Sequence, residues 1–250
     1  MLVTLVAGTL AAKGLLMVDM LAIARLENGK WKNLVSKPSD PVGKLRNIQF
    51  TELGISGTTG KVTIPRLELQ SDVAEGWFAI KEEWSNKVLW SGTAPKFPAT
   101  QVYSPSSKVY LDVVQAHLRA KGLGQAKARI NRVVGVDLDG DGVREVVIEA
   151  APLADMVPRT MEDGKPTDYT SILIRCVRNG KAITVVVAHH DARQDGALGG
   201  ADQLRAIADF DGDGKFEVVG SSDYYEGQSA AVYQFRKGSV RKLVEYGAGV

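Results

Sequence analysis

Two short segments rich in aspartate and glycine carry the side chains in this sequence that are best suited to bind a metal ion. They read DLDGDGVREVV from Asp137 and DFDGDGKFEVV from Asp209, and they agree at every carboxylate and every glycine. Apolar, strand-like residues flank both segments in the same way. The shared pattern and the matching flanks indicate a duplicated element with one common chemistry.

That chemistry is the binding of a hard cation by oxygen. Calcium takes about six to eight oxygen ligands, many of them anionic. Carboxylates at alternate positions converge on one point when glycines between them adopt positive φ and let the chain curl. The last glutamate closes the shell, directly or through water. The predicted ligands of the two sites are, in chain order, Asp137, Asp139, Asp141, the backbone carbonyl of Val143 and Glu145, then Asp209, Asp211, Asp213, the backbone carbonyl of Lys215 and Glu217.

Other kinds of acidic loop fit less well. An EF-hand needs a glutamate at its twelfth position and helices on both sides, but the twelfth positions are Ile148 and Gly220 and the flanks are typical of strands. Cysteine-rich calcium repeats need several cysteines, and Cys176 is the only one. The alternative that stays open is a pair of solvated Asp-Gly turns without metal. Carboxylates crowded into such turns repel one another, so cation binding should stabilise the fold.

At these loops the sequence resembles a known family. The segments GVDLDGDGVREVVI and ADFDGDGKFEVVG are similar to the FG-GAP/VCBS repeats of integrin α-chain propellers and of many bacterial surface proteins. The resemblance implies a calcium loop between two strands of a propeller blade. It covers two copies, in which the FG and GAP tripeptides are absent and the ninth loop position is glutamate.

The elements that must position these loops are mostly strands. Hairpins are predicted at Asn28-Gly29 and Asn179-Gly180, whose residues accept positive φ, and at Lys237-Gly238, which strand-like segments flank. Pro65 places its strand at a sheet edge or a bulge. We expect an N-terminal β region over 1–103, a helix and linker over 104–129, and a β repeat region with two units of about four strands over 130–250. The apolar residues 1–18 are interpreted as buried β-structure, with a signal peptide removed before this start as the alternative.

One helix is expected, over residues 104–121. Ser104 would cap it, and Leu111, Val114 and Leu118 fall three and four positions apart on one face. Gly122 would end it. The predicted fold is therefore mainly β, with propeller-like antiparallel repeats and a single α-helix.

Composition excludes several classes of partner. Thirty-one basic residues nearly balance twenty-nine acidic ones, for a net charge of +2, which argues against a nucleic-acid partner. No apolar run is long enough to span a bilayer. Cys176 lies in the apolar run SILIRCV and is interpreted as a core side chain.

The remaining polar and aromatic candidates have a packing interpretation beside the functional one. His117 is expected to pack against the sheet. His189, His190 and Asp191 are expected to form a polar cluster at the end of a strand. The functional alternative is that His189 or His190 works with a loop carboxylate such as Asp195. Neighbouring strand residues point to opposite faces, so His189 and His190 should not share a metal. Sugar or partner binding and blade packing stay open for Tyr224, Tyr225, Glu226 and Gly227, and for Trp77 with Trp84.

Together these observations predict a calcium-stabilised binding or structural module, non-enzymatic, at the bacterial cell surface or outside the cell, with a protein or carbohydrate ligand. Acid-rich loops of this kind work where calcium is abundant. Two alternatives stay open. One is a secreted hydrolase or lyase acting on polysaccharide, for which Glu226 and His190 are the nominated acid and base. The other is a self-assembling subunit of an extracellular filament.

Overall fold

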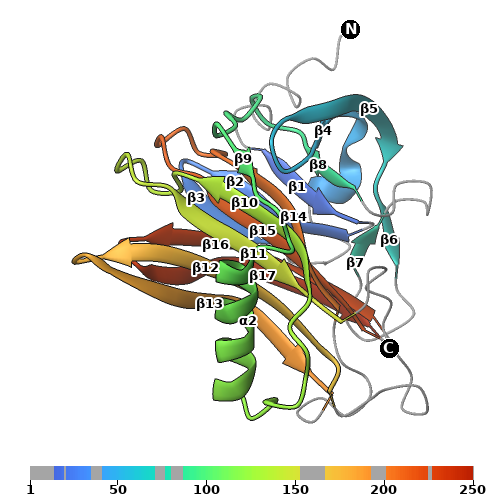
Figure 1. Cartoon of the computed structure of the whole chain (residues 1–250). Coiled ribbons are helices and arrows are strands. Elements are labelled where there is room, and N and C mark those ends of the chain that lie inside the picture. The colour runs from blue at the N-terminus through green and yellow to red at the C-terminus, as the bar shows by residue number, and fades with distance from the viewer. Residues whose placement is uncertain are drawn as a thin grey trace, which may run out of the picture.

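The computed structural model describes residues 14–19, 21–34, 41–70, 77–79, 87–152, 167–192, 201–224 and 227–249. These residues form three antiparallel sheets and a single α-helix (Figure 1). The predicted mainly β class with one helix is confirmed. Within the described part of the chain, no helix is long and apolar enough to cross a membrane.

The N-terminal sheet contains eight strands in the order β5-β4-β8-β1-β2-β7-β6, with β3 paired to β2. Pro65 lies in β5, at one edge of this sheet, as the sequence predicts. A short 3-10 helix, η1 (Pro41–Lys44), precedes β4. The strands are β1 (Leu15–Val18), β2 (Leu21–Glu27), β3 (Lys30–Asn33), β4 (Arg46–Leu53), β5 (Thr58–Arg66), β6 (Glu68–Gln70), β7 (Trp77–Ala79) and β8 (Val88–Trp90).

The other two sheets are meanders of four consecutive strands, as predicted for residues 130–250. We name them the first loop sheet and the second loop sheet, because each carries one Asp/Gly loop between its first two meander strands. The first loop sheet contains β9 (Gln101–Val102) at its edge, then β10 (Ile130–Val136), β11 (Glu145–Ala150), β12 (Tyr169–Arg178) and β13 (Lys181–Asp191). The second contains β14 (Ala201–Ala208), β15 (Glu217–Tyr224), β16 (Gly227–Arg236) and β17 (Ser239–Gly249).

The predicted hairpin turns are confirmed by their backbone angles. Both residues of the turns Asn28-Gly29, Asn179-Gly180 and Lys237-Gly238 have positive φ, between 48° and 78°. Positive φ at both central positions matches the twist of the two strands that such a turn joins. These turns connect β2 to β3, β12 to β13 and β16 to β17.

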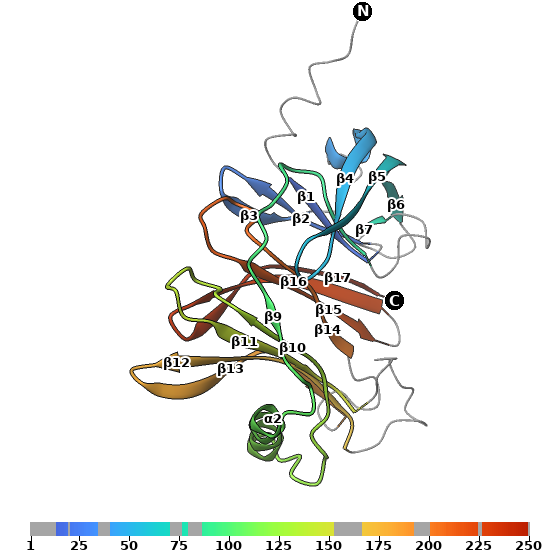
Figure 2. The ribbon, with the colours of Figure 1, turned by 45° about the horizontal axis from the view of Figure 1, so that its top comes forward.

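The three sheets stack in an order that differs from their order in the chain (Figure 2). The second loop sheet lies in the middle. On one side, its Val219 packs with Leu16 and Ile23 of the N-terminal sheet. On the other side, its Val218 packs with Val147 and Ile174 of the first loop sheet. The two valines face opposite sides because successive side chains of a strand alternate. Because both faces of the second loop sheet are buried, two separate apolar cores lie on either side of it.

Helix α2 (Lys108–Ala120) covers the outer face of the first loop sheet. Val114 and Leu118 are fully buried against this sheet, and Leu111 is partly buried, so the predicted apolar face is confirmed. Gly122 has a φ of +77°, and the N–H of Leu123 donates to the carbonyl of Leu118 at 2.7 Å, which closes the predicted C-terminal stop.

The predicted start of the helix was wrong by one turn. Helix α2 begins at Lys108 with Ser107 as the N-cap residue, whereas Ser104 lies in the preceding turn. The Ser104 hydroxyl bonds to the Ser106 hydroxyl at 2.8 Å, and the Ser104 carbonyl accepts the Ser107 N–H at 3.1 Å. The serines therefore satisfy one another in a local turn before the helix begins.

Two valines of helix α2 provide a matched test of how the helix is held. Val114 is 0% exposed and Val109 is 55% exposed. We expect Val114→Ala to lower the free energy of unfolding by about 2 kcal/mol, because it removes buried methyl groups and leaves a cavity. Val109→Ala should leave stability unchanged or raise it slightly. Urea unfolding of both variants measures this, and equal effects would contradict the packing of α2 on the sheet.

Candidate metal centres

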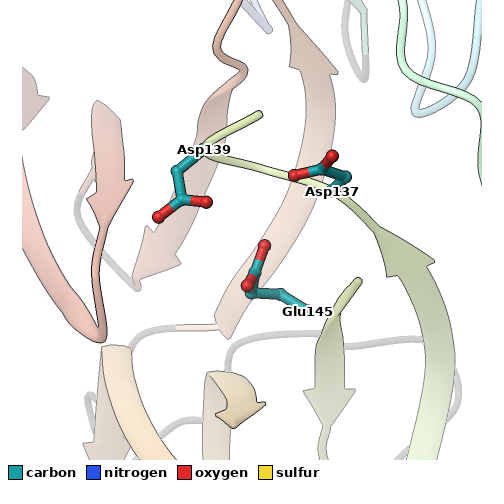
Figure 3. Close-up of side chains that lie close together, drawn as sticks. All are labelled: Asp137, Asp139 and Glu145. Atoms are coloured by element: carbon teal, nitrogen blue, oxygen red, sulfur yellow. The ribbon is translucent and has the colours of Figure 1, made fainter. Parts of the chain in front are cut away.

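The first Asp/Gly loop brings three carboxylates together between β10 and β11 (Figure 3). Asp137 follows the last residue of β10, and Glu145 is the first residue of β11. One carboxylate oxygen from each of Asp137, Asp139 and Glu145 lies within 4.8 Å of the other two. This spacing is short enough for all three oxygens to contact one ion, so this triad could hold a metal.

The second loop repeats the arrangement between β14 and β15. One oxygen from each of Asp209, Asp211 and Glu217 lies within 4.8 Å of the other two. Asp209 and Glu217 are both buried, so this triad is more enclosed than the first. The equivalence of the two triads, position by position, agrees with the duplication seen in the sequence.

The first aspartate of each loop folds the loop around its own carboxylate. Asp137 Oδ1 accepts the N–H of Gly140 at 2.9 Å, and its Oδ2 accepts the N–H of Gly142 at 2.9 Å. Asp209 makes the same two contacts in the second loop. Gly140 and Gly142 have φ values of +73° and +86°, a region that favours glycine. The predicted curl of the loop is thus formed by backbone N–H groups turned toward one carboxylate.

The glutamates are buried among like charges. Glu145 is 3% exposed and Glu217 is 0% exposed. Burial, together with the neighbouring aspartates, raises the pKa of Glu145 to about 7 and that of Glu217 to about 8. Each glutamate also accepts one loop N–H, from Leu138 at 2.9 Å and from Phe210 at 3.1 Å, respectively. The protein alone therefore disfavours the charged form of both carboxylates, which a bound cation would favour.

Each triad contains a buried carboxylate oxygen without a hydrogen-bond partner. These oxygens are Asp139 Oδ1 in the first loop and Glu217 Oε1 in the second. An unpaired buried oxygen is costly, and most such atoms in folded proteins have a partner. A metal ion bound by the triad would supply that partner, so the residues present fit a cation in both loops.

The third aspartate of each loop lies outside the triads. Asp141 Oδ1 accepts the N–H of Val143 at 2.8 Å, and Asp213 Oδ1 accepts the N–H of Lys215 at 2.9 Å. Asp213 also forms an ion pair with Arg236 at 2.8 Å. Ligation by Asp141 and Asp213, and by the carbonyls of Val143 and Lys215, stays a prediction.

Both loops also lie at junctions between sheets, a feature that the sequence analysis missed. The N–H of Phe216 in the second loop donates to the carbonyl of Leu138 in the first at 2.9 Å. The N–H of Lys237, in the turn between β16 and β17, donates to Asp139 Oδ2 at 2.8 Å. The second loop pairs with the segment that follows β8, where Lys96 and Asp209 exchange two backbone hydrogen bonds. Loop geometry and sheet stacking are therefore coupled.

The histidines form two separate networks, because His189 and His190 point to opposite faces of β13 as predicted. His190 Nδ1 lies 2.9 Å from Asp202 Oδ2 of the second loop sheet. On the other face, His189 Nδ1 lies 3.2 Å from Nε2 of His117 on α2 and 2.9 Å from the Ser171 hydroxyl. The sequence analysis treated His117 and His189 separately, since nothing in a single sequence pairs positions 72 residues apart.

The contacts Ser171–His189–Asp191 have the composition of a hydrolase triad, but the site is closed. Ser171 is 0% exposed and Asp191 is 1% exposed. A serine nucleophile must reach the carbonyl of its substrate, and this hydroxyl has no exposed surface. These residues are therefore a buried polar network and not an acyl-transfer site.

Other predicted features have mixed outcomes. Cys176 is buried in the apolar core, which confirms its structural interpretation. Residues 1–13, Trp84, Tyr225, Glu226, Asp195 and the side chains of Trp77 and Tyr224 lie outside the described part of the structure.

No protein-family model, curated protein sequence or solved structure matches this chain.

The raised pKa of Glu217 predicts how stability depends on pH when divalent ions are removed. Its pKa of about 8 in the folded state lies above the ordinary value of 4.5, so the folded protein binds the extra proton between these values. The contribution of this carboxyl group to stability is therefore fully present below pH 4.5 and is lost as the pH rises toward 8. Glu217→Gln abolishes this titration.

We expect Glu217→Gln to be more stable than the ion-free wild type at pH 8, by roughly 1–3 kcal/mol, and the difference to shrink toward pH 5. Urea unfolding after passage over a chelating resin measures this. Glu245→Gln, which changes an exposed glutamate on β17, is the control and should show no such trend. A difference that is independent of pH would contradict the burial of a titrating carboxyl in the second loop.

Proposed function

We propose that this protein is a calcium-stabilised, non-enzymatic binding or structural module that works outside the cell or at its surface. The observation that carries the proposal is the pair of equivalent triads, Asp137–Asp139–Glu145 and Asp209–Asp211–Glu217, each with an unpartnered buried oxygen. Two copies of one geometry in two neighbouring sheets support a shared ligand. The resemblance of both loops to FG-GAP/VCBS repeats supports the same ion.

The ligand chemistry favours calcium over other ions. Each triad offers carboxylate oxygens alone, and imidazole or thiolate groups, which zinc and copper prefer, are absent from the triads. Magnesium demands near-octahedral geometry at about 2.0–2.1 Å, whereas calcium accepts irregular shells at about 2.3–2.6 Å. The first carboxylate also accepts hydrogen bonds from backbone N–H groups, three at Asp137 and two at Asp209. A loop of this kind provides an irregular shell, which suits the larger ion.

The role proposed for the ion is to hold sheet junctions. A divalent charge beside Asp139 would offset the repulsion within the first loop, where Asp139 also accepts the Lys237 N–H of the second loop sheet. In the second loop, an ion bound by Asp209 would act next to the two backbone hydrogen bonds to Lys96. Bound ions would thus stabilise contacts between sheets and not only the two turns.

A shallow groove beside the loops gives the module a surface for a ligand. It has a volume of about 510 Å³ and lies between the segment after β8 and both loops. Arg144 supplies a cationic side chain to its lining, and Phe216 supplies an apolar ring. A protein or carbohydrate ligand carrying a carboxylate would suit this mixture. The lining also includes Pro98, Ala99, Asp137, Gly140, Gly142 and Gly214.

The proposal is tested by thermal unfolding of the wild type with calcium, with magnesium and with chelator. Calcium should raise the melting temperature, since an ion at a hundred times its Kd adds about 2.7 kcal/mol per site. Magnesium should give a smaller rise. The double variant Asp139→Ala/Asp211→Ala should lose the calcium effect, and Asp112→Ala, an exposed carboxylate on α2, should keep it.

The calcium affinity tests the proposed location. Extracellular modules bind calcium with Kd values of about 0.1–1 mM, and intracellular sensors bind it with Kd values of about 0.1–10 μM. Calorimetric titration should give millimolar or submillimolar Kd values. A submicromolar Kd would argue for an intracellular sensor, and an unchanged melting temperature in calcium and chelator would contradict the calcium sites themselves.

A further inference from the structure

Two histidines face each other at the other side of the first loop sheet, between helix α2 and strand β13. His117 projects from α2, and His189 projects from β13 toward it. Their facing nitrogens, His117 Nε2 and His189 Nδ1, are 3.2 Å apart. The two rings are nearly perpendicular, at 88°, with centroids 4.8 Å apart. Two ring nitrogens thus face each other from elements that are distant in the sequence.

We propose that His117 Nε2 and His189 Nδ1 bind a zinc-class transition-metal ion that clips helix α2 to the first loop sheet. Imidazole nitrogen is a preferred ligand of zinc, and also of copper and nickel, whereas calcium prefers oxygen. The site is therefore chemically distinct from the two acidic loops.

The separation of the nitrogens suits this ion. Zinc binds histidine nitrogen at about 2.0–2.1 Å in tetrahedral geometry, which places two ligating nitrogens about 3.3–3.4 Å apart. The 3.2 Å separation therefore needs an adjustment of only a few tenths of an ångström to admit the ion. A hydrogen bond between the two rings also fits this distance, so binding must be measured.

The surroundings of His189 orient it as a ligand. Its other nitrogen, Nε2, lies 3.3 Å from Asp191 Oδ2. Asp191 accepts a hydrogen bond in this contact, which places the ring proton on Nε2 and leaves the lone pair of Nδ1 facing His117. A carboxylate behind a ligating histidine is the usual support of such sites, because it fixes the tautomer and raises the basicity of the ligand.

Other groups around the pair bear on the charge and the coordination of the ion. The Ser171 hydroxyl lies 2.9 Å from His189 Nδ1 and 3.4 Å from His117 Nε2, so it can bind the ion or hydrogen-bond to a water ligand. The positive charge of Lys121 disfavours a cation at this position, whereas the negative charges of Asp191 and Asp202 favour one.

A metal ion at this position would hold helix α2 on the first loop sheet, at one end of the stack of sheets. The two histidines are 72 residues apart in the chain, so joining them closes a long loop. Closing a long loop restricts the unfolded chain more than closing a short one. The ion would therefore stabilise the docking of α2 on the outer face of the first loop sheet, independently of the proposed calcium sites.

The chain offers an internal control, because it contains only three histidines. His190 is adjacent to His189 but faces the other way, toward Asp202. The experiment titrates Zn²⁺ into the full chain, stripped of transition metals and saturated with calcium, by calorimetry. Wild type and His190→Ala should bind one zinc with similar Kd, and His117→Ala and His189→Ala should bind it at least tenfold more weakly. Zinc should also raise the melting temperature of only the first two proteins.

Cobalt substitution tests the site on the wild type alone, should the histidine variants fail to fold. Co²⁺ should give the intense visible bands of a four-coordinate site, and one equivalent of zinc should remove them. Absence of these bands would overturn the proposal. Zinc binding that is equal in wild type, His117→Ala and His189→Ala would also overturn it, because the ion would then lie elsewhere in the chain.

Discussion

The burial of one glutamate at the start of β11 and of another at the start of β15 constrains much of this structure. Glu145 and Glu217 are nearly inaccessible, yet each lies beside aspartates of its own loop. The glutamates cannot move outward without breaking the hydrogen bonds that they accept from loop N–H groups. The like charges must therefore be protonated or balanced by a cation where they lie. Because the loops lie at the junctions between sheets, this requirement bears on the contacts between sheets as well as on the two turns.

One apolar residue in each loop determines which neighbouring sheet the loop packs against. In each loop the residue after the first aspartate is apolar and packs on the next sheet. Leu138 enters the core shared with the second loop sheet, and Phe210 enters the core shared with the N-terminal sheet. Trp31 and Trp90 receive Phe210, with ring centroids 5.6 and 5.1 Å away. The N-terminal sheet thus occupies the position that a further loop sheet would take, although its strands follow a different order.

Local chemistry made much of this fold predictable, and long-range contacts did not. The three hairpin turns and the helix ending at Gly122 depend on neighbouring residues, and all four were found. The helix start was misplaced at Ser104, since a sequence does not show which of several nearby serines caps the helix. The loop spacing indicated every member of the two carboxylate triads, but it did not show that Asp141 and Asp213 lie outside them. The stacking order of the sheets and the meeting of His117 with His189 were not visible in the sequence, because they arise from packing between distant segments.

The segment from β8 to α2 connects these features mechanically. It leaves the N-terminal sheet, exchanges hydrogen bonds with the second loop at Lys96, pairs with β10 through β9, and then forms the helix on the outer face of the first loop sheet. Release of either loop would therefore loosen the path that leads to α2. An oxygen site in the loops and a nitrogen site at His117 would act on opposite ends of this one path. Because hard and borderline ions choose different ligands, each end can be stabilised without competition from the other.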